Sequence, residues 1–178
     1  MGNSHRCESA LGLASAVLQC YNTPWLPNSW GLKDIHFKTQ PDFKLFLMSY
    51  FASSPYMNDA GFGIAQVPIK NYALFALGVA LIELAFGQPF EDLQTKADII
   101  DGERGAYTKY HAAHRLTREL TDEDYKSFAS AIEFCIDPWL QPDGTRNRFL
   151  LENDPFRRQF YRNVVQNLQQ EYQNCLSR

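Results

Sequence analysis

The stretch Asn71–Phe90, NYALFALGVALIELAFGQPF, decides the fold. Leucines recur along it at helical spacing and other large apolar side chains cover the remaining faces: Leu74, Leu77, Leu81 and Leu84, then Phe75, Val79, Ile82 and Phe86. A helix that is apolar all round must be surrounded by protein or lipid. Glu83 interrupts the run, which is also shorter than the roughly 20 apolar residues of a membrane span. We therefore predict the central helix of a soluble helical domain, ending at Gly87 before Pro89.

The composition is that of one folded domain with a proper core. The chain has 178 residues, of which 45% are hydrophobic and 14% aromatic, and its net charge is -3. This excludes a disordered chain, and the absence of a Lys/Arg stripe gives no reason to expect a nucleic-acid partner. The densest basic group lies among acidic residues, so solvated helix faces explain it more simply than an anion site: Arg146, Arg148, Arg157, Arg158 and Arg162.

Four cysteines, Cys7, Cys20, Cys135 and Cys175, are far apart and include no C-x-x-C pair. No apolar secretory leader precedes them. We therefore expect free thiols in a reducing, intracellular and most simply cytoplasmic setting. Cys20 and Cys135 fall within apolar helical patterns and are predicted to be small core residues.

The rest of the chain also shows helical periodicity. Residues 1–8 are expected to be a flexible N-terminus and residues 9–178 a single domain. Helices are predicted over 9–21, 106–120, the segment that ends at Pro138, and the segment that begins near Asp154, with a shorter one within 91–101. Thr121–Asp124 is expected to cap the third of these, and Asn153 or Asp154, with Pro155 following, the last.

The segment between the first two helices contains the expected non-helical structure. Trp25 and Trp30 lie in a Pro/Asn/Gly-rich loop, where packing onto the core is the simpler interpretation and ligand stacking the alternative. Residues 34–37 and 43–51 flank turn chemistry at 39–42, which predicts one small β-hairpin. Residues 52–69 are expected to form a long ordered loop with a functional role or origin.

A family resemblance appears at Leu77–Phe90, LGVALIELAFGQPF. This run resembles the central helix of the protein-kinase C-lobe, roughly S-x-G-x-x-L-x-E-L-x-x-G-x-x-P-F. It is more similar still to a fungal kinase-like domain of unknown function that accompanies HeLo-type modules in prion-related and incompatibility proteins. Further stretches in the expected order extend the resemblance over roughly residues 11–170: 18–26, 29–37, 115–116, 131–135 and 156–165. The resemblance implies a mainly α, kinase C-lobe-like domain.

The departures from active kinases imply that phosphoryl transfer is absent. If 34–37 matches the kinase N-I-L-L segment, the catalytic His-Arg-Asp falls on residues 27–29, which are Pro, Asn and Ser. The metal-holding Asp-Phe-Gly falls on Leu47, Met48 and Ser49, and Ala73 replaces the Asp of the central helix. No Gly-rich loop or strand Lys is present. We therefore expect no nucleotide cofactor and no metal.

Other candidate chemistry has a structural explanation beside the functional one. His111 and His114 share a helix face, as surface histidines or as part of a metal or acid/base site. Gly61–Gly63 is expected to be a turn rather than a phosphate loop, and the 122–124 acidic cluster a helix cap. Glu83 is expected to pair with a cation or backbone donors rather than act in catalysis. Cys135 is expected to be buried rather than nucleophilic.

The first functional hypothesis is a non-catalytic, pseudokinase-like interaction module. Without an N-lobe, the upper surface of a C-lobe is uncovered, and an exposed aromatic patch there would bind another protein or a second copy of this chain. The predicted surface residues are Trp25, Trp30, Asp34, His36, Tyr50 and Tyr56. The alternative is a small enzyme or small-molecule-binding protein that uses the cleft between hairpin and central helix, with Asp34, His36, His111 and His114 as its polar groups. A third reading, fungal immunity or incompatibility signalling, rests on the resemblance alone.

Overall fold

The structure is a computed structural model, and most of what it describes is helical. The described residues are 3–23, 25–26, 30–38, 44–47, 69–99, 105–122, 125–139 and 149–177. The main helices are α1 (Asn3–Cys20), α2 (Tyr72–Phe86), α4 (Ala106–Asp122), α5 (Lys126–Ile136), α6 (Asp154–Phe160) and α7 (Gln166–Ser177). Shorter elements are α3 (Phe90–Leu93), the 3₁₀ turns η1 (Leu32–Asp34) and η2 (Lys96–Asp98), and the π-helical segment η3 (Tyr161–Val165). None of the described helices is long and apolar enough to cross a membrane.

Helix α2 begins and ends at residues suited to those positions. At its start, the Asn71 side chain accepts a hydrogen bond from the N–H of Leu74 at 3.1 Å. At its end, Gly87 has a φ of 68°, a left-handed conformation that glycine adopts without a Cβ penalty. The Gly87 N–H donates to the Glu83 carbonyl at 2.8 Å. The predicted central helix and its glycine stop are confirmed.

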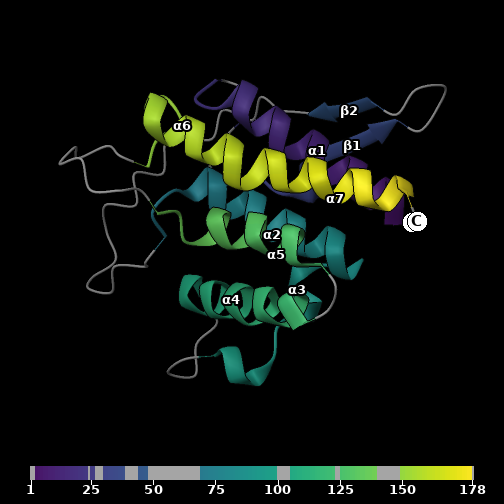
Figure 1. Cartoon of the computed structure of the whole chain (residues 1–178). Coiled ribbons are helices and arrows are strands. Elements are labelled where there is room, and N and C mark those ends of the chain that lie inside the picture. Colours follow the sequence, from purple (N-terminus) through teal and green to yellow (C-terminus); the bar gives the residue numbers. More distant parts are fainter. Residues whose placement is uncertain are drawn as a thin grey trace.

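Helices α2 and α5 form the middle of the bundle (Figure 1). Helix α1 and the continuous α6–η3–α7 rod lie side by side on one side of them, and α4 lies on the other. Large apolar side chains from all of these helices are fully buried together: Leu13, Leu74, Leu77, Leu81, Ile82, Leu116, Ile132, Ile136, Phe156, Phe160 and Leu168. Most of α2 is buried, which agrees with its lack of a polar stripe, while the face that carries Tyr72, Ala76 and Val79 is only partly covered.

Gly78 allows α2 and α5 to approach closely. A Cβ built on Gly78 would lie 3.1 Å from Ile136 Cγ1 and 3.2 Å from Cys135 Cβ, closer than most real Cβ contacts. Cys135 is fully buried in this contact, as predicted, and burial raises the pKa of its thiol. The absence of a side chain at Gly78 therefore sets the spacing of the two central helices.

The first helix is longer than the sequence pattern predicted. The segment 1–8 was expected to be flexible, but α1 begins at Asn3. Cys7 is buried, and Arg6 Nη1 donates to the Ala85 carbonyl at the end of α2, at 3.1 Å. The predicted helix start at residue 9 is wrong, because the polar residues before it show no apolar helical pattern. Here Arg6 instead satisfies a carbonyl that the last turn of α2 leaves without an intrahelical donor.

One of the two predicted helix caps is confirmed and the other is wrong. The Asn153 side chain accepts from the Phe156 N–H at 3.2 Å, and Pro155 stands in the first turn of α6, as expected. The predicted cap at 121–124 is wrong, because α4 continues to Asp122 and α5 begins at Lys126, with no side-chain cap from Tyr125. Residues 123 and 124 lie outside the described part of the chain.

Two short strands lie beside the helices. Strands β1 (Ile35–Lys38) and β2 (Lys44–Leu47) pair antiparallel, with Ile35 opposite Leu47 and Lys38 opposite Lys44. Their connection, the predicted turn at 39–42, lies outside the described residues, as do 48–68. The hairpin and the ordered loop at 52–69 therefore stay predictions.

A buried ion pair fixes the segment after α3 to α4. Arg115 donates to both carboxylate oxygens of Asp98, at 2.9 and 2.8 Å, and to the Leu93 carbonyl at 2.9 Å. Asp98 also accepts from the backbone N–H of Thr95 at 2.7 Å. The hydrogen bonds from Arg115 lower the pKa of the Asp98 carboxyl from 3.8 to about 2, and the carboxylate raises the pKa of Arg115 in turn.

Replacement of Gly78 by leucine is expected to lower the free energy of unfolding by about 2–3 kcal/mol, because the new side chain has no space between α2 and α5. The higher helix propensity of leucine opposes this by only about 1 kcal/mol. Urea unfolding measures the difference. The matched control is Gly105→Leu, at a site where a Cβ meets nothing within 4 Å, and it should change stability by less than about 1 kcal/mol. Equal effects at both positions would contradict the close approach.

Replacement of Asp98 by asparagine is expected to lower stability at pH 7 by about 2 kcal/mol. Because the pKa of Asp98 is depressed in the folded chain, its contribution is present above pH 3.8 and is lost as the pH falls toward 2. The variant should therefore approach the wild type in stability between pH 4 and pH 2, as measured by urea unfolding at each pH. Asp92→Asn, on the exposed surface of α3, is the control and should stay within about 0.5 kcal/mol at pH 7.

Candidate functional site

The predicted surface residues do not form one patch within the described structure. Trp25 is 55% exposed, but Trp30 is only 5% exposed and belongs to the core cluster. The expectation that both tryptophans lie on an open surface is therefore corrected for Trp30, whose indole is large enough to fill space beside α2. The side chains of Asp34 and His36, and the whole of Tyr50 and Tyr56, lie outside what the structure describes.

Trp30 lies at one wall of a groove of about 630 Å³ between the η1 segment and the end of α2. Its Nε1–H is buried and has no hydrogen-bond acceptor among the described residues. The groove carries two lysines and two glutamates, so its charge is mixed: Lys33, Lys109, Glu83 and Glu91. Such a groove offers charged side chains of both signs to a ligand.

Glu83 has a structural contact at this groove. Its Oε1 accepts a hydrogen bond from the backbone N–H of Phe90 at 2.8 Å. That donor holds the chain as it leaves α2 through Gly87 and enters α3. Partial burial raises the pKa of the Glu83 carboxyl, and the Phe90 N–H acts in the opposite direction. The predicted pairing of Glu83 with a backbone donor is confirmed.

The two helix-face histidines have different environments. His111 is exposed, whereas His114 is half-buried between α4 and α5, with its ring 4.5 Å from that of Tyr110. Burial lowers the pKa of His114, so its imidazole is neutral at pH 7. Its Nε2 has no hydrogen-bond partner within the described ranges. A pocket of about 360 Å³ holds His114 with Ser130, Glu133, Asp137, Trp139 and Asn163.

Of the polar groups of the predicted small enzyme, only the two α4 histidines have described side chains. His114 lines the α4–α5 pocket without His111, whereas the side chains of Asp34 and His36 lie outside the described part of the chain. Within the described ranges, no three His, Cys, Asp or Glu side chains are placed to hold a metal ion. The His114 pocket holds a serine and carboxylates beside the imidazole, but His114 Nε2 accepts no hydrogen bond from Ser130 among the described residues, whereas covalent catalysis needs the nucleophile hydrogen-bonded to its base.

A hydrogen-bonded junction holds together the end of the bundle on the left of Figure 1, where α1 ends, α2 begins, α5 ends and α6 begins. The Asn71 amide donates to the Tyr21 hydroxyl and to the Phe149 carbonyl, both at 2.8 Å. Lys70, the residue before Asn71, donates to the Pro138 carbonyl at 3.1 Å and forms an ion pair with Asp137 at 2.5 Å. Four segments far apart in sequence thus meet through two adjacent residues.

Large apolar side chains are exposed around this junction. Tyr72 is 55% exposed and Trp139 is 54% exposed. Trp25 and Leu150 are exposed as well. Each of these four residues lies within four positions in sequence of a residue that takes part in the junction, namely Tyr21, Asn71, Pro138 or Phe149. We call these four residues the aromatic end. Trp139 rests with its edge against Phe134, at 6.2 Å between ring centroids, so its position is defined by the core.

Sequence reasoning found only one of these four residues. The loop composition identified Trp25 as a surface candidate. Tyr72 is part of the apolar helical pattern, and Trp139 follows a helix-terminating proline, so neither was predicted to lie on the surface. No periodicity reveals that the start of α2 and the end of α5 lie together. The single usable signal was Trp139 itself, since an aromatic residue directly after a helix-terminating Pro138 has no helical face to pack on.

The comparisons with known proteins give a family. No curated protein and no solved structure matches the chain significantly. The sequence model of a domain of unknown function, DUF7580, matches residues 4–175. The match includes α1 and ends within the last turn of α7, so it covers the whole helical bundle. The chain belongs to this family of domains of unknown function, DUF7580.

Proposed function

We propose that the chain is a non-catalytic interaction domain that binds another protein chain through the aromatic end. The observation that carries this proposal is the exposure of Trp25, Tyr72, Trp139 and Leu150 around one rigid junction. Tryptophan and tyrosine are enriched in protein interfaces because they bury a large area at a low entropic cost. Four exposed large side chains held by packed helix ends are a pre-organised surface.

The charges around the aromatic end favour a protein partner over a nucleic acid. Lys70 and Asp137 form an ion pair at its rim, so the two charges compensate each other. An apolar centre with a polar, roughly neutral rim is the usual anatomy of a protein interface. A nucleic-acid surface would instead carry uncompensated Lys and Arg. The partner is a second copy of this chain or a different protein with a complementary apolar patch.

We also propose that the domain derives from a protein-kinase C-lobe that has lost its active site. Support comes from the buried central helix α2, its Gly87 stop, and the Glu83 contact to Phe90, all within the stretch that carries the resemblance. The replaced catalytic and metal-binding positions are consistent with this origin. A role in fungal immunity or incompatibility signalling is part of this proposal and rests on the resemblance alone.

The double variant Trp25→Ala, Trp139→Ala is expected to weaken association at least tenfold, because two anchors of the proposed interface are lost. Self-association is measured by sedimentation velocity over a range of concentrations. Binding to other proteins is measured as the change in cross-linked partners between variant and wild type.

The matched control is Tyr161→Ala, which removes a 44% exposed aromatic side chain of η3 that is not one of the four residues of the aromatic end. It should leave association unchanged. Circular dichroism and thermal unfolding confirm that each variant is folded. Undiminished association of a folded double variant, or an equal loss in Tyr161→Ala, would overturn the proposed surface.

The alternative function is small-molecule binding in the groove beside Trp30. The observation that favours it is the buried Trp30 Nε1–H, which has no acceptor among the described residues, at the wall of a hollow that also offers Lys33 and Lys109. An anionic ligand with an acceptor oxygen would fit those donors. Under this alternative a nucleotide such as ATP would bind in the groove, whereas the interaction proposal expects no nucleotide binding.

Thermal unfolding with and without Mg²⁺ and ATP is expected to show no shift, because the phosphate- and metal-binding groups of a kinase are missing. Binding at a hundred times the dissociation constant would add about 2.7 kcal/mol, or roughly 5–10 °C for a chain of this size. A shift of that size, abolished by Lys33→Ala with Lys109→Ala, would replace the interaction proposal by the ligand-binding alternative. A shift that survives both changes would contradict both readings.

A further inference from the structure

Two cysteines that are 168 positions apart in sequence lie against each other. Cys7 is in the second turn of α1 and Cys175 is in the last turn of α7. Their Sγ atoms are 2.8 Å apart, closer than two sulfur atoms lie without bonding or sharing a hydrogen. Both are free thiols in the structure. A disulfide requires an approach to about 2.05 Å, so only a small side-chain movement separates the two states.

The packing of the first and last long helices produces this contact. Figure 1 shows α1 and α7 side by side, with the start of α1 near the end of α7. Cys7 belongs to the same buried stripe of α1 as Ala10 and Ala14, and Cys175 continues the stripe of Leu168 and Glu171 on α7. The two stripes face each other. Cys7 lies one helical turn before Ala10 and Cys175 lies one turn after Glu171, so the two thiols meet.

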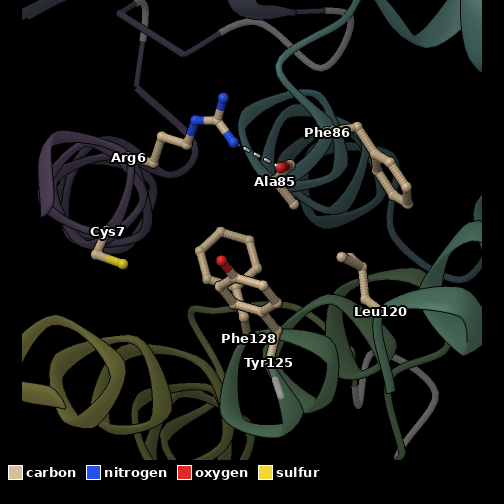
Figure 2. Close-up of a pocket in the computed structure, with 7 residues that line it drawn as sticks. All are labelled: Arg6, Cys7, Ala85, Phe86, Leu120, Tyr125 and Phe128. Carbon is tan, nitrogen blue, oxygen red and sulfur yellow. Dashed lines mark hydrogen bonds between the residues drawn. The ribbon is translucent and has the colours of Figure 1, made fainter. Parts of the chain in front are cut away.

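The start of α1 is also held from its other side. Figure 2 shows the Arg6 guanidinium reaching the Ala85 carbonyl while Cys7 borders a cavity between the helices. The cavity has a volume of only about 50 Å³, room for very few water molecules. Cys7 is itself only 3% exposed, whereas Cys175 is half-buried, so Cys175 is the more accessible of the two thiols for a peptide-sized oxidant.

We propose that Cys7 and Cys175 are a reversible disulfide-forming pair that joins α1 to α7 when the chain meets a small-molecule disulfide such as oxidised glutathione. This site is independent of the aromatic end, which lies at the opposite ends of these two helices and contains neither cysteine. The proposal concerns a covalent modification of the domain and does not depend on the proposed function.

The reaction proceeds in two exchange steps that balance. The Cys175 thiolate attacks one sulfur of oxidised glutathione, forms a mixed disulfide and expels one glutathione thiolate. Cys7 then loses its proton and attacks Cys175 Sγ, which expels the second glutathione. Two protein thiols lose two electrons and two protons, and one oxidised glutathione becomes two reduced molecules. Reduced glutathione in excess, or dithiothreitol, reverses both steps.

The environment of Cys7 assigns it the second step. Burial raises its pKa to about 12, and the hydrogen bond with Cys175 and the neighbouring charges act in the same direction. A buried thiol with a high pKa is a poor first nucleophile. Once Cys175 carries glutathione, Cys7 attacks an adjacent sulfur inside the protein, where proximity compensates for its low thiolate fraction.

The test incubates the reduced, folded chain with oxidised glutathione and follows intact mass, peptide links and thermal unfolding. The wild type should become two hydrogen atoms lighter, with Cys7 linked to Cys175 in peptides cut after Arg6, Glu8 and Glu171. Its melting temperature should rise by roughly 5–15 °C, because the bond closes a long loop, and dithiothreitol should reverse the rise.

Matched variants separate this pair from the other two cysteines. Cys20→Ser should behave as the wild type, whereas Cys7→Ser and Cys175→Ser should form no internal link and show no rise in melting temperature. Cys7→Ser should instead keep one glutathione on Cys175. The proposal is overturned if the folded wild type gains only glutathione adducts, if the link involves Cys20 or Cys135, or if the linked chain melts no higher than the reduced one.

Discussion

The structure depends on the burial of most of helix α2. A helix with no polar stripe is stable in water only if other elements cover most of its surface. Here α1, α4 and α5 provide that cover, and Gly78 lets α5 come close enough to exclude water. The caps at Asn71 and Gly87 satisfy backbone groups that the helix termini leave without intrahelical partners, at the buried start of α2 and at its exposed end.

The same requirement explains where polar groups are buried. Asn71 caps α2 with its oxygen and uses its amide to bind Tyr21 and Phe149, which places two other segments relative to the start of the helix. At the other end, Arg6 and Glu83 bind backbone groups of α2 and of the chain that leaves it. These side chains satisfy donors and acceptors that would otherwise be costly to bury, and they are therefore poor candidates for catalysis.

The surface features follow from the ends of this arrangement. At one end the helix termini meet through Asn71 and Lys70 and leave large aromatic side chains in solvent. At the other, α1 and α7 bring two thiols into contact. The junction and the thiol pair thus lie at different ends of the bundle. The proposed binding surface and the proposed disulfide therefore share no residues.

The sequence by itself determined the helical class, the central helix, its capping residues and most of the other helices, because periodicity and caps are local properties. It misplaced the start of α1, where Arg6 acts through a contact with a distant segment, and the cap of α5. Only the tertiary structure decided that Trp30 is buried, that the segments next to Trp25, Tyr72 and Trp139 meet at one junction, and that Cys7 meets Cys175. Each of these depends on which helix faces pack together, and residues up to 168 positions apart carry no local signal of that packing.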